Sequence, residues 1–475
     1  MTYSLEMHES FDCPRSAEDV FYYIADFSRI DEWDHTIIEA KKSSPGQIGV
    51  GTTFDLVYKN GFKTTSIQYT VNHYEPFKKL IMVGEAESFT AVDTVTLSQT
   101  DNGCHVDWHA ALEFHGTAAK IVKLVEGRVK KAGAKTIKDL SVALQDNYPA
   151  PTATSAQKLA DKLVLPAMFG FTKYGYRRGT KHWHPVTANM RGKYVVVTGG
   201  TSGLGKQTAT ELAHRGAEVL IVGRDQNKCE EVVAQIIEQT GNQSVFFEVA
   251  DLSLIQDVRD LSTRMQRVGK AIDVLVNNAG ALFNPRQTTA EGLEISFALL
   301  LLSPVILTQE LLPLLKKAKN ARVINVSSGG MYAKRISVNN LQSDKGEYGG
   351  SAAYARCKRG LVIHGEEWAK EWQEHGITVH NMHPGWALTP GVETALPEFA
   401  DKMNRFLRDS KEGADTIVWL ACATEVAKTS GLFWFDRTPH TTHLTAKTRE
   451  TSAQRKALLE AVGEYVDGAK RVPSV

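Results

Sequence analysis

The stretch Thr198-Gly199-Gly200-Thr201-Ser202-Gly203-Leu204-Gly205 follows an apolar run, Tyr194 to Val197, and precedes a helical stretch, Lys206 to Arg215. This order of strand, glycine-rich turn and helix is typical of a site for the pyrophosphate of a dinucleotide. The glycines let the backbone approach the phosphates, and the first helical turn offers free N–H groups at the positive end of its dipole. The stretch therefore predicts an α/β dinucleotide-binding domain.

A second pattern lies about 150 residues later, in Tyr354-Ala355-Arg356-Cys357-Lys358. A tyrosine and a lysine four residues apart share one helix face. The lysine charge favours the phenolate and is expected to lower the pKa of Tyr354 from its ordinary value of about 10. Reduction of a carbonyl needs a proton donor beside a hydride source. The two patterns together predict a reductase in which Tyr354 donates the proton.

The totals set bounds on the class of protein. The chain has 475 residues, enough for two or three domains, and a net charge of +1 gives no general attraction for nucleic acid. Its five cysteines lack CxxC spacing, which favours a reducing compartment over disulfides or a metal site. The polar N-terminus and a longest apolar run of about 14 residues, Ile295 to Thr308, predict neither signal peptide nor membrane span. We therefore expect a soluble cytoplasmic protein without metal or nucleic acid.

The chain changes character between residues 146 and 190. Strand-like alternation dominates before this point, and strands alternate with helices after it. The sequence Pro149 to Ser155 has the composition of a linker. We therefore divide the chain into residues 1–146, a linker at 147–190, and residues 191–475.

Residues 1–146 predict an α+β domain. Ser16 is expected to cap a helix, with Asp19 completing a capping box. A long amphipathic helix is expected over Thr117 to Leu144. Together with the strands this gives a curved antiparallel sheet that grips a long helix around an apolar cavity. The expected strands are Tyr3–Asp12, Thr52–Lys59, Thr64–His73, Lys79–Glu85, Val92–Gln99 and Cys104–Phe114.

The same region resembles a known superfamily. The segments Cys13 to Phe21 and Ile24 to Phe27, with Trp33, are similar to the SRPBCC superfamily, which includes Bet v 1-like, START and polyketide-cyclase-like domains. The resemblance implies a helix-grip fold that binds a hydrophobic ligand. It does not assign one activity, because the superfamily contains carriers, cyclases and hydrolase activators.

Residues 191–475 resemble the short-chain dehydrogenases/reductases. Within them they are most similar to the retinol-dehydrogenase-like members and to the orphan dehydrogenase/reductase subgroup numbered twelve. The resemblance implies a doubly wound parallel sheet of the Rossmann type. The strings that carry it are the glycine-rich turn, Asn277-Asn278-Ala279-Gly280, Val326-Ser327-Ser328-Gly329-Gly330-Met331, the Tyr354/Lys358 pair, His383-Pro384-Gly385-Trp386, Thr389-Pro390-Gly391 and the tail from Gly413 to Leu444.

The resemblance also assigns the coenzyme contacts. Arg224 follows the second strand, where this fold meets the adenosine ribose. An arginine fork suits a 2′-phosphate, so NADP(H) is favoured and NAD(H) is the alternative, since the turn lacks a second basic residue. Asp251 and Leu252 are expected at the adenine. The full predicted set is Gly199, Thr201, Ser202, Gly203, Leu204, Gly205, Arg224, Asp251, Leu252, Asn278, Ala279, Gly280, Tyr354, Lys358, Pro384, Gly385 and Thr389.

For catalysis the resemblance implies Ser328, Tyr354 and Lys358, with Ser328 preferred over Ser327 as the group that holds the substrate oxygen. One position departs from the family. In the long helix after the fourth strand the family has an asparagine that supports a proton relay to the lysine, and this chain has Leu300. Leucine neither donates nor accepts a hydrogen bond. Another group carries the relay, or turnover is slow, or the domain only senses the coenzyme.

Three further segments bear on partners. An apolar lid over Val392 to Arg408, with Leu396, Phe399, Met403, Phe406 and Leu407, favours an apolar substrate or is simply a helix core face. The aromatic and basic residues of 158–185 are expected to pack on the reductase, with weak contact with a membrane surface as the alternative. His105, Asp107 and His109 alternate on one strand and are expected to be ordinary strand residues rather than a metal site. A homodimer follows by analogy with the family.

These observations leave three functional hypotheses. The first is an NADP(H)-dependent oxidoreductase for the carbonyl or alcohol of a hydrophobic small molecule, such as a lipid, retinoid, steroid or polyketide-like compound, with an N-terminal ligand-binding domain. The second is a non-catalytic lipid-binding protein whose dinucleotide domain senses redox state, which Leu300 favours. The third is a bifunctional cyclase-reductase, for which residues 1–146 show no specific acid/base pair.

Overall fold

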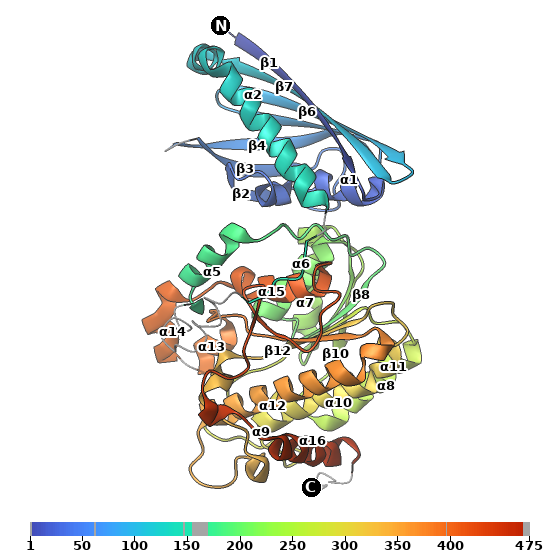
Figure 1. The fold of residues 1–475 in the computed structure, drawn as a ribbon, viewed down its shortest axis with the longest axis vertical. Coiled ribbons are helices and arrows are strands. Elements are labelled where there is room, and N and C mark those ends of the chain that lie inside the picture. The colour runs from blue at the N-terminus through green and yellow to red at the C-terminus, as the bar shows by residue number, and fades with distance from the viewer. Residues whose placement is uncertain (1, 61–62, 146–147, 154–169, 396, 469–475) are drawn as a thin grey trace. The chain divides into compact units, whose positions relative to one another are not determined.

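The computed structural model describes residues 2–60, 63–145, 148–153, 170–395 and 397–468 (Figure 1). The chain forms two compact units. The first consists mainly of residues 1–148 and 184–189, and the second mainly of residues 149–183 and 190–475. None of the helices within the described ranges is long and apolar enough to cross a membrane.

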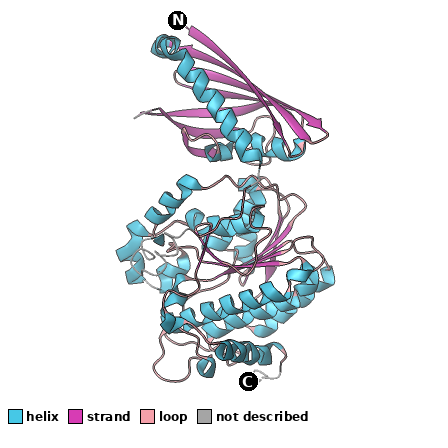
Figure 2. Ribbon diagram, viewed as in Figure 1, coloured by secondary structure: helices cyan, strands magenta, loops and turns pink. Residues whose placement is uncertain are grey.

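The first unit is built on a seven-stranded antiparallel sheet in the order β1-β7-β6-β5-β4-β3-β2 (Figure 2). All six predicted strands are present, with ends shifted by up to three residues, and the sequence reading did not name β2. The predicted curved antiparallel sheet of a helix-grip fold is therefore confirmed. The strands are β1 (Thr2–Cys13), β2 (Ile37–Lys42), β3 (Thr53–Asn60), β4 (Lys63–Glu75), β5 (Lys79–Ala86), β6 (Phe89–Thr100) and β7 (Gly103–His115).

Two α-helices complete this unit. In α1 (Ala17–Ala25), the Ser16 side chain accepts a hydrogen bond of 3.2 Å from the Asp19 N–H, which confirms the predicted N-cap. The second half of the predicted capping box differs, because the Asp19 carboxylate accepts from Asn189 instead. The long helix α2 (Gly116–Gln145) spans the predicted range, and its backbone leaves helical geometry at Val125.

Aromatic side chains fill the interior of the first unit. Phe27 contacts Trp33, Phe54, Tyr69 and Trp108, with ring centroids 5.0–6.5 Å apart. These rings come from η1 (Phe27–Glu32), the following turn and three strands, so they tie the sheet to the helical face. The sequence predicted an apolar cavity in this unit, and in the structure these rings belong to the buried core between the sheet, α1 and the end of α2.

One acid lies inside this cluster and escaped the sequence analysis. The Asp93 carboxylate on β6 accepts a 2.8 Å hydrogen bond from the Trp108 indole and one of 3.0 Å from the Tyr69 hydroxyl. Burial raises the pKa of Asp93, and the two hydrogen bonds partly oppose that shift. Within the period-2 pattern of β6, Asp93 occupies an inward position that sequence reading assigns to an apolar residue.

The histidines on β7 pair across the sheet with β1. His105 bonds Asp12 at 2.8 Å, Asp107 bonds His8 at 2.7 Å, and His109 lies 3.7 Å from Glu6. Each pair joins neighbouring strands on a partly exposed face. The three residues are therefore ordinary strand residues with cross-strand partners.

The second unit contains an eight-stranded sheet in the order β10-β9-β8-β11-β12-β13-β14-β15, parallel except for the β14–β15 pair. The helices α6, α7 and α15 cover one face, and α8, α10 and α12 cover the other (Figure 1). The predicted doubly wound Rossmann sheet is therefore confirmed. The strands are β8 (Tyr194–Thr198), β9 (Glu218–Gly223), β10 (Val245–Val249), β11 (Val274–Asn277), β12 (Arg322–Val326), β13 (Thr378–Met382), β14 (Phe433–Phe435) and β15 (Thr438–His440).

The helices of this unit connect the strands in the expected alternation. Their bounds are α5 (Lys173–Gly179), α6 (Gly203–His214), α7 (Gln226–Thr240), α8 (Ile255–Val268), α9 (Ile295–Phe297), α10 (Ser303–Glu310), α11 (Leu312–Leu315), α12 (Gly350–Glu371), α13 (Pro390–Ala395), α14 (Pro397–Met403), α15 (Ser410–Cys422) and α16 (Ser452–Val466). The long helix expected after the fourth strand is interrupted, because a π-helical turn, η3 (Ala298–Leu302), separates α9 from α10.

The segment before the first strand of this unit packs on residues that follow β13 and on β14, as the sequence predicted for its aromatic residues. The Phe171 ring contacts His383, Trp386 and Phe435 at centroid distances of 4.5, 5.7 and 5.3 Å. Tyr174 contacts Phe406 at 5.9 Å. The part of the predicted aromatic and basic segment at 158–169 lies outside the described residues.

Candidate functional site

The strand ends of the second unit enclose a cavity of about 670 Å³. It lies at the carboxyl ends of β8, β9, β11 and β12, which is where ligands bind in open parallel sheets. The residues of the full predicted coenzyme set, together with Ser328, all line this one cavity. They are Gly199, Thr201, Ser202, Gly203, Leu204, Gly205, Arg224, Asp251, Leu252, Asn278, Ala279, Gly280, Ser328, Tyr354, Lys358, Pro384, Gly385 and Thr389.

The glycine-rich turn fits a dinucleotide pyrophosphate. Gly199 has a φ of +65°, and a Cβ at Gly205 would lie 2.2 Å from the Gly199 carbonyl oxygen, so neither position accepts a side chain. Helix α6 begins at Gly203, and its N-cap residue Ser202 makes no side-chain capping bond. The first N–H groups of α6 are thus directed at the cavity without a side-chain acceptor, as an anion site requires.

The adenosine end of the cavity is defined by Arg224 and Asp251. Arg224 is exposed and follows β9 directly, so its guanidinium is accessible to a ligand. One Asp251 oxygen accepts from the N–H and hydroxyl of Ser253 at 2.9 and 2.7 Å, which fixes the carboxylate. Among the described residues, this end of the cavity therefore offers an exposed cation and an oriented carboxylate.

The catalytic candidates meet on the opposite side of the cavity. Tyr354 and Lys358 lie one turn apart on α12, and the Lys358 Nζ is 5.9 Å from the Tyr354 ring centroid. Ser328 follows β12, accepts a hydrogen bond from the Gly330 N–H at 3.1 Å, and interacts with the Tyr354 hydroxyl. The neighbouring Ser327 donates to the Lys358 carbonyl at 3.1 Å, so its hydroxyl is already engaged. This geometry favours Ser328 for a substrate oxygen.

Burial dominates the electrostatics of this group. Lys358 is 3% exposed and donates a 2.7 Å hydrogen bond to the Val326 carbonyl, and burial lowers its pKa to about 8. Burial raises the pKa of Tyr354, and the interaction with Ser328 opposes this only in part. The sequence predicted a lowered pKa for Tyr354. That direction is wrong for this structure, because desolvation of the phenol outweighs the other influences on it.

Leu300, which stands where the family has an asparagine, lies close to the Lys358 amine. Leu300 is fully buried on the π-helical turn η3. A Cβ at Gly280 would lie 2.8 Å from Leu300 Cδ2 and 3.4 Å from Lys358 Nζ, so the leucine methyl and the amine flank the same glycine. Leu300 thus presents alkyl surface where the family has an amide, and contributes to the desolvation of Lys358.

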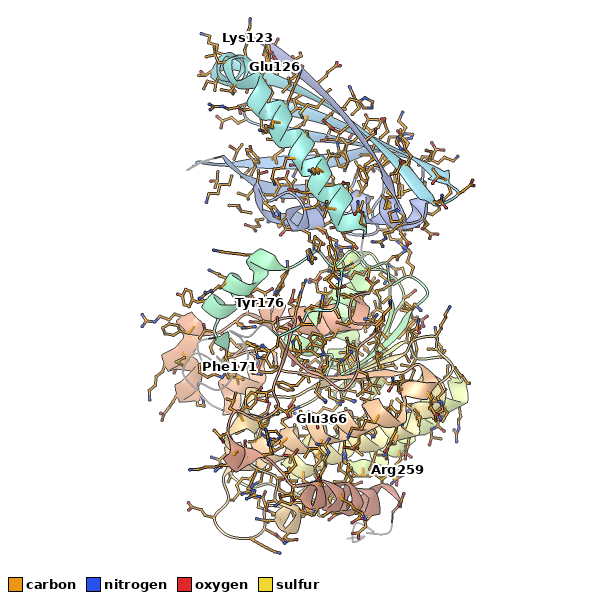
Figure 3. The ribbon with its side chains drawn as sticks, viewed as in Figure 1. Lys123, Glu126, Phe171, Tyr176, Arg259 and Glu366 are labelled. Carbon is orange, nitrogen blue, oxygen red and sulfur yellow. The ribbon has the colours of Figure 1, made fainter. Side chains whose placement is uncertain are left out.

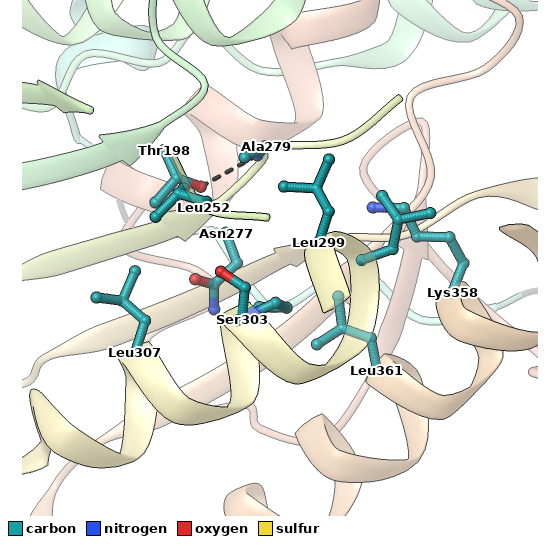
Figure 4. Close-up of a pocket in the computed structure, with 11 residues that line it drawn as sticks. Thr198, Leu252, Asn277, Ala279, Leu299, Ser303, Leu307, Lys358 and Leu361 are labelled. Carbon is teal, nitrogen blue, oxygen red and sulfur yellow. Dashed lines mark hydrogen bonds between the residues drawn. The ribbon is translucent and has the colours of Figure 1, made fainter. Parts of the chain in front are cut away.

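A small cavity of about 10 Å³ lies behind this group (Figure 4). Leu300 and Lys358 line it together with Asn277 and Ser303. Asn277 is the first residue of the predicted Asn277–Gly280 string, but it does not line the large coenzyme cavity. Its side chain turns the other way and donates to Thr308 and Asn325, because position 277 is inward on a strand buried on both faces.

The sequence also did not predict the hydrogen bonds that hold the substrate side of the cavity in place. The Trp386 N–H donates to the Phe171 carbonyl at 2.8 Å, and the buried Arg408 donates to the carbonyls of Gly170 and Phe171. Arg408 also forms hydrogen bonds of 2.6 and 2.9 Å with Asp436. The predicted lid forms α13, α14 and a 3₁₀ turn, η7 (Asn404–Phe406). Leu396 and the Phe399 side chain lie outside the described residues.

The fold and the site define a dinucleotide-binding domain with a Ser-Tyr-Lys group. Residues 193–398 match the family model described as short chain dehydrogenase. The human dehydrogenase/reductase SDR family member 12 is 41% identical over 305 residues, which are 63% of this chain and 95% of that relative. The chain therefore belongs to the short-chain dehydrogenase/reductase family, and its second unit is an oxidoreductase domain of the retinol dehydrogenase type.

The chain is also similar to other known proteins, and a second family model matches the first unit. Human retinol dehydrogenase 13 is 33% identical over 258 residues, covering 53% of this chain and 78% of the relative. A solved RhlG/NADP complex from Pseudomonas aeruginosa is 28% identical, covers 53% of this chain and 96% of its own, and has a TM-score of 0.43. Residues 4–142 match the family model described as polyketide cyclase / dehydrase and lipid transport, which confirms the SRPBCC resemblance.

Proposed function

We propose that the protein is an NADP(H)-dependent oxidoreductase that acts on the carbonyl or alcohol of a hydrophobic small molecule. One observation carries this proposal. Ser328, Tyr354 and Lys358 line the same cavity as the glycine-rich turn, so a dinucleotide held at the turn would extend toward the proton donor. The family supports the oxidoreductase class.

The proton chemistry follows from the positions of the three residues. Nicotinamide coenzyme, when bound, supplies or accepts the hydride at the substrate carbon. Tyr354 gives its hydroxyl proton to the carbonyl oxygen in reduction and takes it back in oxidation, while Ser328 holds that oxygen by a hydrogen bond. Lys358, charged below its pKa of about 8, stabilises the tyrosinate that forms.

Arg224 supports NADP(H) over NAD(H). It is an exposed cation at the end of β9, with its guanidinium on the cavity wall. A fork of N–H donors binds a 2′-phosphate in two places, whereas a ribose hydroxyl gains little from it. NAD(H) remains the alternative, since Arg224 is the one basic residue at this end of the cavity in the described chain.

The substrate end of the cavity supports an apolar ligand. Large aliphatic and aromatic side chains line the cavity beside the polar ones, which matches ligand pockets that bind by burial of apolar surface. The first unit, with its lipid-transport type of fold, would capture such a ligand, and covalent fusion would raise the local concentration of the ligand at the oxidoreductase. The apolar lining residues are Leu282, Phe283, Ile295, Leu299, Trp386 and Val392.

Purified full-length protein with NADPH and a panel of apolar aldehydes and ketones tests the proposal. We expect oxidation of NADPH that exceeds oxidation of NADH, and loss of turnover in Tyr354→Phe with coenzyme binding retained. Phenylalanine keeps the ring packing and removes only the proton donor. Turnover by Tyr354→Phe at the rate of the parent protein would refute the assigned mechanism.

A non-catalytic coenzyme sensor is the second candidate, and Leu300 is the observation that favours it. The leucine replaces a polar group beside the Lys358 amine and removes one route for proton supply. This candidate predicts tight coenzyme binding without turnover across the whole panel. For the bifunctional cyclase alternative, the buried Asp93, which is bonded to Tyr69, is a candidate acid in the first unit. A cytoplasmic location and a homodimer remain predictions.

A further inference from the structure

The long helix of the first unit carries an unusual share of the positive charge of the chain. Helix α2 has seven lysines and arginines and two acids, although the whole chain has a net charge of only +1. Lys123 and Glu126 in Figure 3 mark the part of α2 just before and after the break at Val125. This excess is concentrated on one element and does not reflect overall composition.

Most of these cations have no acidic partner. Glu126 pairs with Lys130 at 2.8 Å and Asp139 with Lys135 at 2.5 Å, which uses both acids of the helix. Among the residues that the structure describes, no carboxylate lies within ion-pair distance of the remaining cations, all of which are exposed. These cations are Lys120, Lys123, Arg128, Lys131 and Lys138.

Two large apolar side chains lie exposed next to these cations. Leu124 is 86% exposed and Ile121 is 56% exposed. They do not serve the packing of the helix, because Ala119 and Val122 face the sheet and contact the cluster around Leu5 and Phe114. An exposed leucine and isoleucine one turn apart leave most of their apolar surface in water.

The exposed residues follow the helical repeat within each part of α2. Arg128, Lys131, Lys135 and Lys138 are spaced alternately by three and four residues, which places them along one face of the helix after the break at Val125. Ile121 and Leu124 lie one turn apart before the break. We call these six residues, with Lys120 and Lys123, the α2 stripe.

We propose that the α2 stripe binds the surface of an anionic lipid bilayer. Lys and Arg side chains would contact lipid phosphates and carboxylates, while Leu124 and Ile121 would enter the boundary between headgroups and acyl chains. Lys120 and Lys123 flank the apolar pair, and their long stems allow the ammonium groups to stay at headgroup level. A nucleic acid would account for the charge but not for the exposed leucine, and the pairing of both features favours a membrane.

Co-sedimentation of the full-length protein with lipid vesicles tests this proposal. The probes are phosphatidylcholine vesicles with and without phosphatidylserine. We expect binding that needs phosphatidylserine and falls as salt is raised, because surface charges are screened. The variant Lys131→Gln/Lys138→Gln should bind roughly fivefold more weakly per lysine removed. Leu124→Gln/Ile121→Gln should weaken binding without changing its dependence on salt.

Matched variants separate the stripe from general charge and apolar surface. Lys41→Gln/Lys319→Gln removes two exposed lysines elsewhere, and Val50→Gln/Val268→Gln removes two apolar side chains that are 70% and 76% exposed. Both control variants should bind like the parent protein. The proposal fails if the parent does not bind phosphatidylserine vesicles, if the control variants lose as much binding as the stripe variants, or if a short nucleic acid competes binding away. The readout needs no turnover, so it is independent of the proposed reaction.

Discussion

The Lys358 ammonium donates a 2.7 Å hydrogen bond to the carbonyl of Val326, the last residue of β12. This bond fixes the lysine at the carboxyl end of β12, and both Lys358 and Tyr354 line the cavity. The same contact takes a charged group out of water, because Lys358 is almost fully buried. The fold therefore positions Lys358 but pays the free energy of removing its ammonium from water. This free energy can be measured.

Stability should depend on pH through Lys358. Its pKa falls from 10.5 to about 8 on folding, so the unfolded chain binds more protons between these values and stability rises with pH across that window. Lys358→Met removes this dependence. We expect the unfolding free energy of the variant, relative to the parent, to improve by roughly 2 to 3 kcal/mol when the pH is lowered from about 10 to about 7.

Urea unfolding at the two pH values measures this difference. The lost hydrogen bond to Val326 gives an offset that is the same at both pH values and does not affect the comparison. Leu302→Met, a buried substitution that removes no charge, is the control. An equal difference between variant and parent at both pH values would show that Lys358 folds with an ordinary pKa.

Arg224 should decide between the two coenzymes. Arg224→Ala is expected to lower kcat/KM for NADPH by about tenfold to a hundredfold, the range for hydrogen bonds to a charged group, and to leave NADH within a few-fold. Lys228→Ala removes a nearby cation on α7 that does not line the cavity and should change neither value. Equal losses for both coenzymes would mean that Arg224 does not contact a 2′-phosphate.

The coenzyme end of the site could be predicted from sequence because its signals are local. Glycine at 199 indicates a positive φ, and glycine at 205 indicates a close approach of the helix to the turn. Both features are present in the structure. Arg224 and Asp251 could be placed because each ends a short apolar strand, and strand ends of a parallel sheet converge. A sequence motif thus predicts the local structure correctly where a single residue determines the backbone conformation.

The remaining features depend on partners distant in sequence. The run Ala298 to Leu302 is uniformly apolar, so nothing in it marks the π-helical turn that places Leu300 beside Lys358. Asn277 follows the period of its strand into the core, although its motif is associated with the coenzyme. The raised pKa of Tyr354 arises from burial by several segments, which spacing along one helix does not reveal.

Shortening Leu300 should change the pH dependence of catalysis. Leu300→Ala removes alkyl surface beside the Lys358 amine and lets water approach, so the lysine pKa should rise and the alkaline limb of the kcat profile should move to higher pH. Leu302→Ala creates a similar cavity away from the amine. Both variants should lose about 2 to 5 kcal/mol of stability, but only Leu300→Ala should shift the limb. The same shift in both would assign it to loosened packing.

Phe171 should affect the substrate more than the coenzyme. Its ring packs against His383 and Trp386, next to the segment Pro384–Gly385 that lines the cavity. Phe171→Ala keeps the main-chain bond to Trp386 and removes the packing behind it, at about 3 to 5 kcal/mol of stability. Because Trp386 is on the substrate side, we expect a higher KM for the carbonyl substrate and a nearly unchanged Kd for NADPH.

Steady-state kinetics with NADPH titration by fluorescence measures both quantities. Phe246→Ala, on the edge strand β10 and 48% exposed, is the control for loss of an aromatic ring in the same domain. It should leave KM and Kd unchanged. If Phe171→Ala weakened NADPH binding as much as it raised KM, the segment at 170–172 would support the whole cavity. If Phe171→Ala raised KM alone, residues 170–172 would determine substrate specificity, although they precede the first strand of the oxidoreductase domain.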